Sequence, residues 1–420
     1  MRAVPRLPRP RIPRPRIPIF TYLAVMGPGI ITAAANNDAG GITTYSLAGA
    51  RFGYQMLWIL LLLTVLLGIT QEMGARMGAV TGKGLADLIR EEFGLRAAVF
   101  ALLTLLIANV GVTAAEFAGV ASGAELFGMS RFVAVPVVAL GVWFIVSSGS
   151  FRRVERIFLV FVLFFVSYVV SGVLAKPDWN EVAHHLVVPS WNADPQFLLL
   201  AIALTGTTVA PWGQFFIQSY IRDKGVRPKD YPLARVDVLT GAVFTNTIAF
   251  FIIVSTAATL FVNGLPIDSA KDAAQALGPI AGDNAQVLFG LGLIAASILA
   301  ACILPLSTAY VVCEAFGWES GIGKEWGIAP VFNAIFTAMI VVGAGVVLIP
   351  GINPFSLVVL TQTANGILLP VILIYTVRLA SDRGLMGERA NGPIYQIFTW
   401  ICTIGLIGLA AYLVAAPFLT

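Results

Sequence analysis

The amino-acid sequence predicts an all-α polytopic membrane protein, and composition is the first observation that does so. Of the 420 residues, 58% are hydrophobic and only 11% are charged, whereas a soluble domain carries about 25% charged residues. Stretches without any charge recur along the chain, for example 238–262 and 352–377. Each is long enough for the roughly 20 residues that cross about 30 Å of hydrocarbon. A water-soluble globular fold is therefore excluded.

Apolar runs long enough to cross the membrane number about eleven, which predicts about eleven transmembrane helices. In order they are 20–50, 54–79, 97–124, 132–150, 154–175, 196–221, 237–262, 284–314, 330–349, 354–378 and 393–417. The Arg- and Pro-rich stretch 1–18 precedes them and is expected to be a disordered tail, because proline lacks an amide donor and the arginines repel one another.

The basic residues set the expected orientation. With the tail in the cytoplasm, nearly all of the 26 Lys and Arg residues fall on the cytoplasmic side, as the positive-inside rule requires. The external side keeps only Arg51, Arg131, Lys176 and Lys271. We therefore expect a multi-pass protein of the cell membrane with a cytoplasmic N-terminus and an external C-terminus.

Two segments contain helix-breaking residues at mid-depth. They are Asn36, Asn37, Asp38, Gly40 and Gly41 in the first segment, and Gly206, Pro211 and Gly213 in the sixth. Broken backbone at this depth is tolerated only where it faces protein or a wet cavity. Breaks at corresponding places in two five-helix halves predict an inverted repeat with a substrate site between the broken helices.

This pattern gives the expected domain organisation. The units are a cytoplasmic tail (1–18), a first five-helix repeat (19–176), an external loop (177–195), a second, inverted five-helix repeat (196–380), and a loop with an eleventh helix (381–420).

Three acidic residues lie well inside the expected spans, where each ionisable group costs about 2.5–3.5 kcal/mol or more. Glu72 has a partner four residues on in Arg76, on the same helical face. Glu116 has no local partner, which leaves open a structural hydrogen bond or a place along an ion path. Asp38 lies among glycines that unwind the helix, so its carboxylate and the freed backbone carbonyls predict an oxygen site for a cation.

Three stretches together carry a family resemblance. They read GPG…NNDAGGITTYSLAGARFGYQMLW from Gly27, QEMGARMGAVTGKGLADLIREEFG from Gln71 and STAYVVCEAFG from Ser307. In order and spacing they resemble the Nramp family of divalent-metal transporters, over most of residues 20–380. The resemblance implies a LeuT-like fold, in which the first and sixth helices are broken.

The resemblance also implies site residues. The family's Asp-Pro-Gly-Asn signature reads Asp38-Ala39-Gly40-Gly41 here, so the ligating asparagine is lost. The Met-Pro-His signature reads Ala210-Pro211-Trp212, so the thioether and the histidine are lost too. The implied metal ligands are Asp38, Gly41 and Ala210 of these signatures, two carbonyl groups at Ala35 and Thr207, and the span-ten glutamine, Gln362.

The family's proton-path pattern Asp-Leu-Ala-Glu becomes Glu116-Phe117-Ala118-Gly119, which removes the second acid. We take Glu116, Asn37 and Trp212 as candidates for the ion path. These departures are similar to the Nramp-related magnesium transporter branch. Without a soft sulfur ligand nothing favours Mn²⁺ or Fe²⁺ over abundant Mg²⁺, and Mg²⁺ prefers a site where it keeps several waters beside one or two carboxylates.

The resulting hypothesis is a secondary transporter that brings Mg²⁺, and also Mn²⁺, into the cytoplasm without a coupled proton. One alternative is an ordinary proton-coupled Mn²⁺/Fe²⁺ transporter, and another is a cationic amino-acid transporter of LeuT-like fold. We expect no enzyme activity, because no nucleophile–base pair is present. We also expect no cofactor, no nucleic acid and no obligatory protein partner. The metal ion is substrate, and the lipid bilayer is the surrounding partner.

Overall fold

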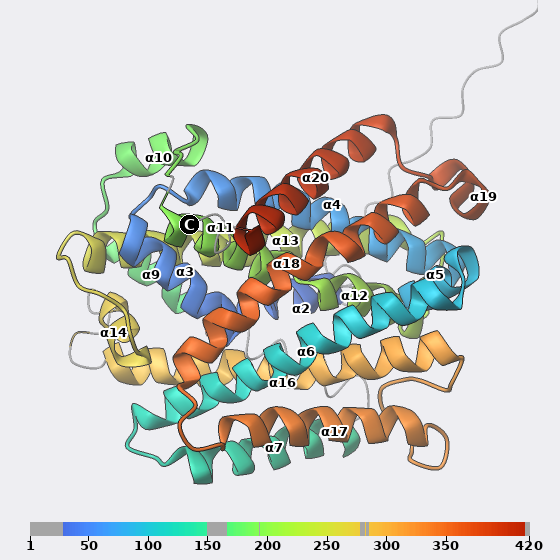
Figure 1. Ribbon diagram of the computed structural model, residues 1–420, viewed down its shortest axis with the longest axis horizontal. Helices are drawn as coiled ribbons and strands as arrows, with labels where there is room; N and C mark the ends of the chain where they lie inside the picture. Colours follow the sequence, from blue (N-terminus) through green and yellow to red (C-terminus); the bar gives the residue numbers. More distant parts are fainter. Residues whose placement is uncertain (1–27, 149–165, 193, 278–281, 283–284, 416–420) are drawn as a thin grey trace, which may run out of the picture.

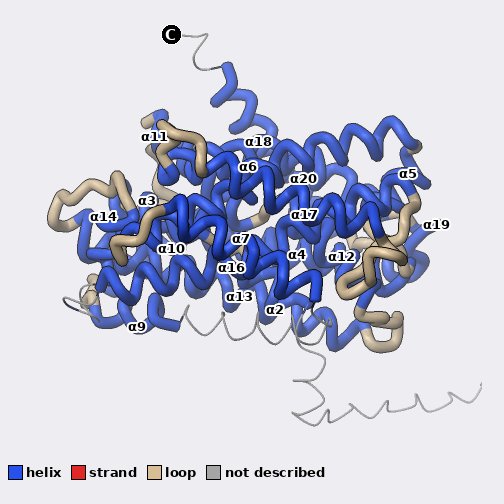
Figure 2. The backbone as a smooth tube through the Cα atoms, turned by 90° about the horizontal axis from the view of Figure 1, so that it is seen from below, coloured by secondary structure: helices blue, strands red, loops and turns tan. Residues whose placement is uncertain are grey.

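The computed structural model describes residues 28–148, 166–192, 194–277, 282 and 285–415, and these residues form a bundle of helices without any β-strand (Figures 1 and 2). The expected all-α membrane fold is therefore confirmed. The tail 1–18, the start of the first span, and most of 154–175 lie outside the described residues.

The membrane-spanning helices follow the expected order. They are α2 (Pro28–Ala34) with α3 (Ala39–Phe52), α4 (Leu57–Thr81), α6 (Leu95–Glu125), α7 (Arg131–Ser148), α9 (Val166–Leu174), α11 (Pro195–Thr208) with α12 (Pro211–Asp223), α13 (Tyr231–Thr256) continued by the π-helix η2 (Ala257–Phe261), α16 (Ala285–Phe316), α17 (Pro330–Val347), α18 (Pro354–Ser381) and α20 (Pro393–Ala415). Among the described residues, eight helices or joined helix pairs are long and apolar enough to cross a membrane.

Short helices connect the spans. They are α5 (Leu85–Phe93), α10 (Trp179–Val187), α14 (Ala270–Ala274), η3 (Gln275–Leu277), α19 (Arg383–Met386) and η5 (Gly387–Arg389). Helix α10 lies within the expected external loop 177–195, where the sequence interpretation foresaw no helix. The carboxylate of Asp178 caps α10 by accepting hydrogen bonds from the backbone N–H groups of Asn180 (2.9 Å) and Glu181 (3.3 Å), the usual role of an aspartate at this position.

The two broken helices lie in the centre of the bundle. Helix α13 packs against α2, α3 and α4, whereas α18 packs against α6 and α11, and α12 packs against α4 and α16. Of the most apolar 18-residue stretch in the pair formed by α11 and α12, 89% is buried inside the protein. The corresponding share for α20 is 17%. Figure 1 shows α20 on one side of the bundle and α7 with α17 on the opposite side. The breaks are therefore shielded by protein, as broken backbone at membrane depth requires.

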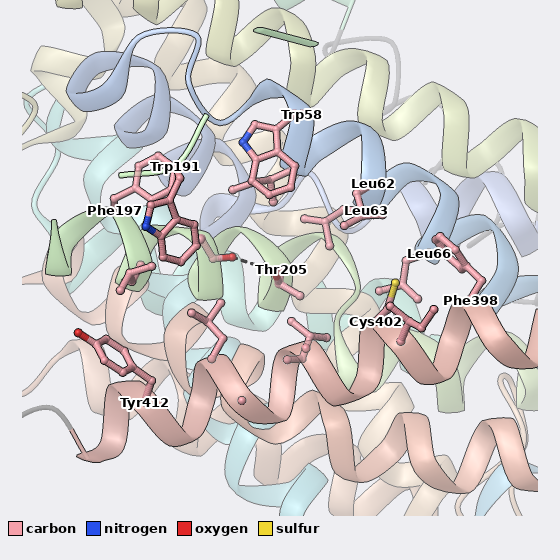
Figure 3. A pocket seen from close by; sticks show the side chains of 18 residues that line it. Trp58, Leu62, Leu63, Leu66, Trp191, Phe197, Thr205, Phe398, Cys402 and Tyr412 are labelled. Carbon is pink, nitrogen blue, oxygen red and sulfur yellow. Dashed lines mark hydrogen bonds between the residues drawn. The ribbon is translucent and has the colours of Figure 1, made fainter. Parts of the chain in front are cut away.

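A large groove lies beside α20, with a volume of about 710 Å³. Side chains of α4, α11 and α20 line it, together with Trp191 (Figure 3). The aromatic residues Trp58, Phe197 and Tyr412 are among them, and no residue of α3 is. The groove is apolar and does not include Asp38, so it is distinct from the expected site.

Candidate functional site at the broken helices

The first break is organised by Asp38. Helix α2 ends at Ala34 and α3 begins at Ala39, and the Asp38 side chain caps α3 by accepting a hydrogen bond from the backbone N–H of Gly41 (2.6 Å). The residue is buried, with 3% of its surface exposed. A carboxylate is favourable here because the N-terminus of a helix carries partial positive charge. Asp38 thus lies where the N–H groups at the start of α3 can stabilise a negative charge.

Both breaks leave a carbonyl group without its helical partner. In a continuous helix the carbonyl oxygen of Thr207 would accept from the N–H of residue 211, but that residue is proline and has none. The carbonyl of Ala35 would accept from the N–H of Ala39, which donates instead to Oε2 of Glu116 (3.1 Å). The two carbonyl groups that the family resemblance singles out are therefore among those released by the breaks.

Side-chain amides tie the breaks to each other and to α13. The Nδ2 atom of Asn36 donates to the carbonyl oxygen of Thr208 (3.1 Å), and Nδ2 of Asn37 donates to that of Thr245 (3.1 Å). The hydroxyl groups of Tyr45 and Thr208 lie 3.0 Å apart. These bonds hold α2, α3 and α11 around a common centre.

Several buried polar atoms around this centre have no partner among the described residues. They are Asn36 Oδ1, Asn37 Oδ1, Glu116 Oε1, Thr207 Oγ1, Gln362 Nε2 and Asn365 Oδ1. Buried polar groups in proteins normally have at least one hydrogen-bond partner, and the exceptions mark sites of water, ions or ligands. Most of these atoms are oxygens, the ligand type that hard cations prefer.

Glycine is required at both positions after Ala39. A β-carbon on Gly40 would collide with the side-chain amide of Gln362 on α18. A β-carbon on Gly41 would collide with the carbonyl oxygen of Asn36 and lie 3.2 Å from the ring of Tyr45. Glycine in place of the family's asparagine at position 41 therefore opens no cavity, because the unwound backbone of Asn36 occupies the space.

The remaining expected site residues lie at the second break and beside it. Ala210 caps α12 and is 3% exposed, and the indole of Trp212 is buried with 1% exposed. Ser307 on α16 donates to the backbone oxygen of Trp212 (3.1 Å). On α6, a β-carbon at Gly119 would collide with the Ala39 side chain and with Oγ of Ser297. A second acid at that position would not fit this packing.

Glu116 is the side chain that joins α6 to the first break. It is fully buried, it accepts from Ala39, and its carboxyl group lies within interaction distance of that of Asp38. Among the described residues no three His, Cys, Asp or Glu side chains converge on a metal-sized position. A cation bound here would thus depend on one or two carboxylates together with carbonyl groups and water.

The family described as "Natural resistance-associated macrophage protein-like", or Nramp, matches residues 29–416. The chain belongs to the Nramp family. A divalent metal cation transporter, MntH, of Ralstonia nicotianae is 30% identical over 411 residues, covering 92% of this chain and 89% of its own. The corresponding MntH of Bacillus subtilis is 25% identical, covering 94% and 93%.

Among solved structures, a mutant of the Eremococcus coleocola manganese transporter superposes with a TM-score of 0.80. It covers 97% of this chain and 90% of its own, at 18% sequence identity. At that identity the likeness establishes the fold alone. This Nramp protein therefore has the LeuT-like architecture of that family, and its relatives are transporters rather than enzymes.

The Nramp protein also contains a network of charges at the α5 end of the bundle. Arg222 of α12 pairs with Glu314 of α16 (3.0 Å) and with Asp87 of α5 (3.6 Å). Tyr310 donates to Asp223 (2.5 Å). Burial raises the pKa of the Asp87 carboxyl above its usual value, and hydrogen bonding to Gly84 and the charge of Arg222 partly offset this rise.

The expected pair Glu72–Arg76 is confirmed at 3.2 Å, and Tyr231 adds a hydrogen bond to Glu72.

Sequence reasoning missed two further buried acids, Glu314 and Asp237, which are 2% and 1% exposed. The expected spans placed both acids at helix ends. In the structure α13 begins six residues earlier and α16 ends two residues later than expected, so both acids lie within their helices. The N–H of Gly29 donates to Asp237 (2.7 Å), so this acid holds α2 against α13.

We predict that the Glu116–Ala39 hydrogen bond stabilises the first break. Glu116→Leu leaves a buried N–H without its partner, which costs about 1–3 kcal/mol, whereas Glu116→Gln retains an acceptor oxygen. The unfolding temperature of Glu116→Leu in detergent should fall well below that of Glu116→Gln. Glu125→Leu, at the exposed end of the same helix, is the control and should leave it unchanged. Equal unfolding temperatures for the two Glu116 variants would contradict this role.

Proposed function

We propose that this Nramp protein carries Mg²⁺ and Mn²⁺ into the cytoplasm by alternating access. The observation that supports this most directly is the composition of the break. Asp38 is a buried anionic group beside released carbonyls, and Ala210 stands where the family signature has a methionine. The relatives' names, divalent metal cation transporter and manganese transporter, support a divalent cation as substrate.

The proposed ligands act through oxygen. Asp38 supplies the charge, and the carbonyl groups of Ala35 and Thr207 face the ion directly or through water. Gln362 lies against Gly40 and its Nε2 has no partner, so a turn of the amide directs its oxygen to the break. Gly41 and Ala210 contribute backbone only. Asn37, Glu116 and Trp212 line the approach to the site.

An ion held this way keeps much of its hydration shell. Mg²⁺ dehydrates reluctantly and is commonly bound through one or two carboxylates with several waters. Without a thioether, no soft ligand selects transition metals. Mn²⁺ accepts the same oxygen ligands and is carried too, whereas Ca²⁺ requires 6–8 oxygens at 2.3–2.6 Å, more than one carboxylate and a few carbonyls provide.

In the proposed orientation the N-terminus is cytoplasmic and the C-terminus external. The membrane potential alone then supplies roughly 4.6 kcal/mol per 100 mV for a divalent cation that moves inward. The family's proton path is replaced by Trp212 and by the packed Gly119, which leaves no room for a second acid. Transport without a coupled proton follows from these two positions.

One observation favours the second candidate, a proton-coupled Mn²⁺/Fe²⁺ transporter of the ordinary Nramp type. The carboxyl group of Glu116 lies beside Asp38, and its Oε1 atom has no hydrogen-bond partner. Two neighbouring buried carboxyl groups can share a proton, so Glu116 could release one when a cation binds. Proton measurements separate this candidate from the first.

We expect Asp38 to be indispensable. Asp38→Asn keeps an acceptor for the Gly41 N–H and removes only the charge, so the fold should survive while Mg²⁺ and Mn²⁺ uptake into proteoliposomes is abolished. Asp178→Asn is the matched control, because it changes a helix-capping aspartate outside the site. Wild-type uptake by a monodisperse Asp38→Asn variant would refute the assignment.

Protons should not accompany the ion. Proteoliposomes loaded with a fluorescent pH indicator should show Mg²⁺ uptake, followed with a second dye, and no acidification of the lumen. Uptake should instead follow an imposed membrane potential. Acidification that depends on Mg²⁺ and disappears in Glu116→Gln would establish the proton-coupled candidate.

Selectivity should follow the soft ligand. Ala210→Met restores a thioether and should raise the ratio of Mn²⁺ to Mg²⁺ transport severalfold, because sulfur favours the transition metal. Gly41→Asn added to it should slow transport of both ions, since Asn36 occupies the space of the new side chain. The measured quantity is the ratio of initial rates, with Ca²⁺ as a poorly carried reference. An unchanged ratio in a folded Ala210→Met variant would rule out this account of selectivity.

A further inference from the structure

Three buried glutamines lie between α4 and α12. Gln71 belongs to α4, Gln214 and Gln218 belong to α12, and none is more than 1% exposed. Neither side-chain polar atom of Gln71 or of Gln214 has a hydrogen-bond partner. Gln218 donates from Nε2 to the carbonyl oxygen of Lys83 (3.0 Å), and its Oε1 has no partner. Five polar amide atoms are thus buried and unsatisfied along one helix interface.

The glutamines share this interface because glycines let the helices approach. A β-carbon on Gly74 would lie 3.5 Å from the backbone oxygen of Gln214, and one on Gly78 would lie 2.8 Å from that of Gln218. A β-carbon on Gly213 would lie 3.7 Å from Nε2 of Gln71. Gln214 and Gln218 are one turn apart, so they lie on the same face of α12. Gln71 faces the first turn of α12, next to the second break.

Such an arrangement is unfavourable unless something binds to it. Each polar group that is buried without a hydrogen-bond partner destabilises the fold, whereas an apolar residue of the same shape carries no such penalty. A row of such groups in a membrane protein marks a substrate or water path more often than a structural core. The three glutamines carry no charge, so their amides bind a cation only weakly. Weak binding suits an ion path, because conduction requires that the ion can leave each position.

The row connects the break to the charged network at the α5 end. Next to Gln218, the hydroxyl of Ser219 donates to Oε1 of Glu314 (2.6 Å). Glu314 also pairs with Arg222, and its Oε2 has no hydrogen-bond partner. The row ends close to this carboxyl group, because Gln218 donates to Lys83 and the next residue, Gly84, packs against the side chain of Glu314.

We propose, on the basis of the proposed function, that Gln71, Gln214 and Gln218 form the inner part of the ion path, where their amide oxygens accept hydrogen bonds from water molecules bound to the cation. The three side chains thereby favour an ion that travels with its hydration shell over one that must be stripped of water. They act as specificity-determining residues outside the primary site.

Thiol accessibility tests whether the interface is hydrated. In a variant with Cys302, Cys313 and Cys402 replaced by alanine, Gln214→Cys should react with a hydrophilic methanethiosulfonate at least about tenfold faster than Phe216→Cys, because the reagent reaches a thiol only where the interface holds water. Phe216 is the matched control, because it is equally buried on α12 but packs against Tyr310. Equally slow reaction at both positions would overturn the proposal.

Transport kinetics test the role of the amides. Gln214→Leu and Gln71→Leu should each lower the maximal rate of Mg²⁺ uptake about tenfold, the effect of removing a hydrogen bond to a charged group, and should leave the Kd of Mn²⁺ at the break within twofold. Asn109→Leu, which removes a buried amide of α6 outside the interface, should change neither. Unchanged maximal rates would overturn the proposal.

The two tests keep this proposal separate from the proposed function. If the wild-type protein carried no divalent cation, the proposed function would fail, and fast labelling of Gln214→Cys would still establish a hydrated interface. If the wild-type protein carried Mg²⁺ but Gln214→Cys stayed unreactive, the function would stand and the glutamine path would be wrong.

Discussion

The rest of the site depends on one constraint, the need to satisfy backbone hydrogen-bonding groups where two helices are broken inside a membrane. The first break exposes the N–H groups at the start of α3, and the carboxylates of Asp38 and Glu116 accept from two of them. Asn36 and Asn37 meet carbonyl groups of α11 and α13. The acids that anchor the break are therefore held there by the backbone itself. The N-terminus of α3 offsets part of the cost of burying a negative charge at Asp38, which the proposed function uses to bind a cation.

The same constraint explains which groups remain free. The N–H groups of Ala39 and Gly41 have acceptors, whereas several buried side-chain oxygens around the breaks have no partner among the described residues. The carbonyl groups of Ala35 and Thr207 have also lost their helical donors. An excess of unsatisfied acceptors is the arrangement that a cation, or the water around it, can complete. The uncharged glutamines between α4 and α12 add three unpaired amide oxygens, beside two unpaired amide nitrogens, between the break and the α5 end of the bundle. The proposed function therefore depends on unpaired acceptors rather than on a dedicated cluster of acidic side chains.

Much of the fold and part of the site could be predicted from the sequence, because length, hydropathy and helix breakers act locally. Spans, both breaks and the Glu72–Arg76 pair depend on neighbours in the chain. Within the described residues both breaks and the pair are present, and the helices follow the expected order. What depends on distant contacts could not be predicted. Gly206 was expected as a helix breaker, but it lies inside α11 and is small because the backbone of α18 at Gln362 and Gly366 passes against it. The glutamine row depends likewise on how α4 meets α12.

The departures from the family signatures make physical sense when they are considered together. Loss of the thioether at Ala210 removes the ligand that binds a dehydrated transition metal, and glycine at 119 removes the second acid of the proton path. Under the proposed function, hydrated Mg²⁺ needs neither, because its inner ligands are mostly its own waters, and those waters need acceptors along the route rather than strong ligands at one point. The unpaired amide oxygens of Gln71, Gln214 and Gln218 are suited to accept from such waters, so the proposed path complements the loss of strong ligands at the break.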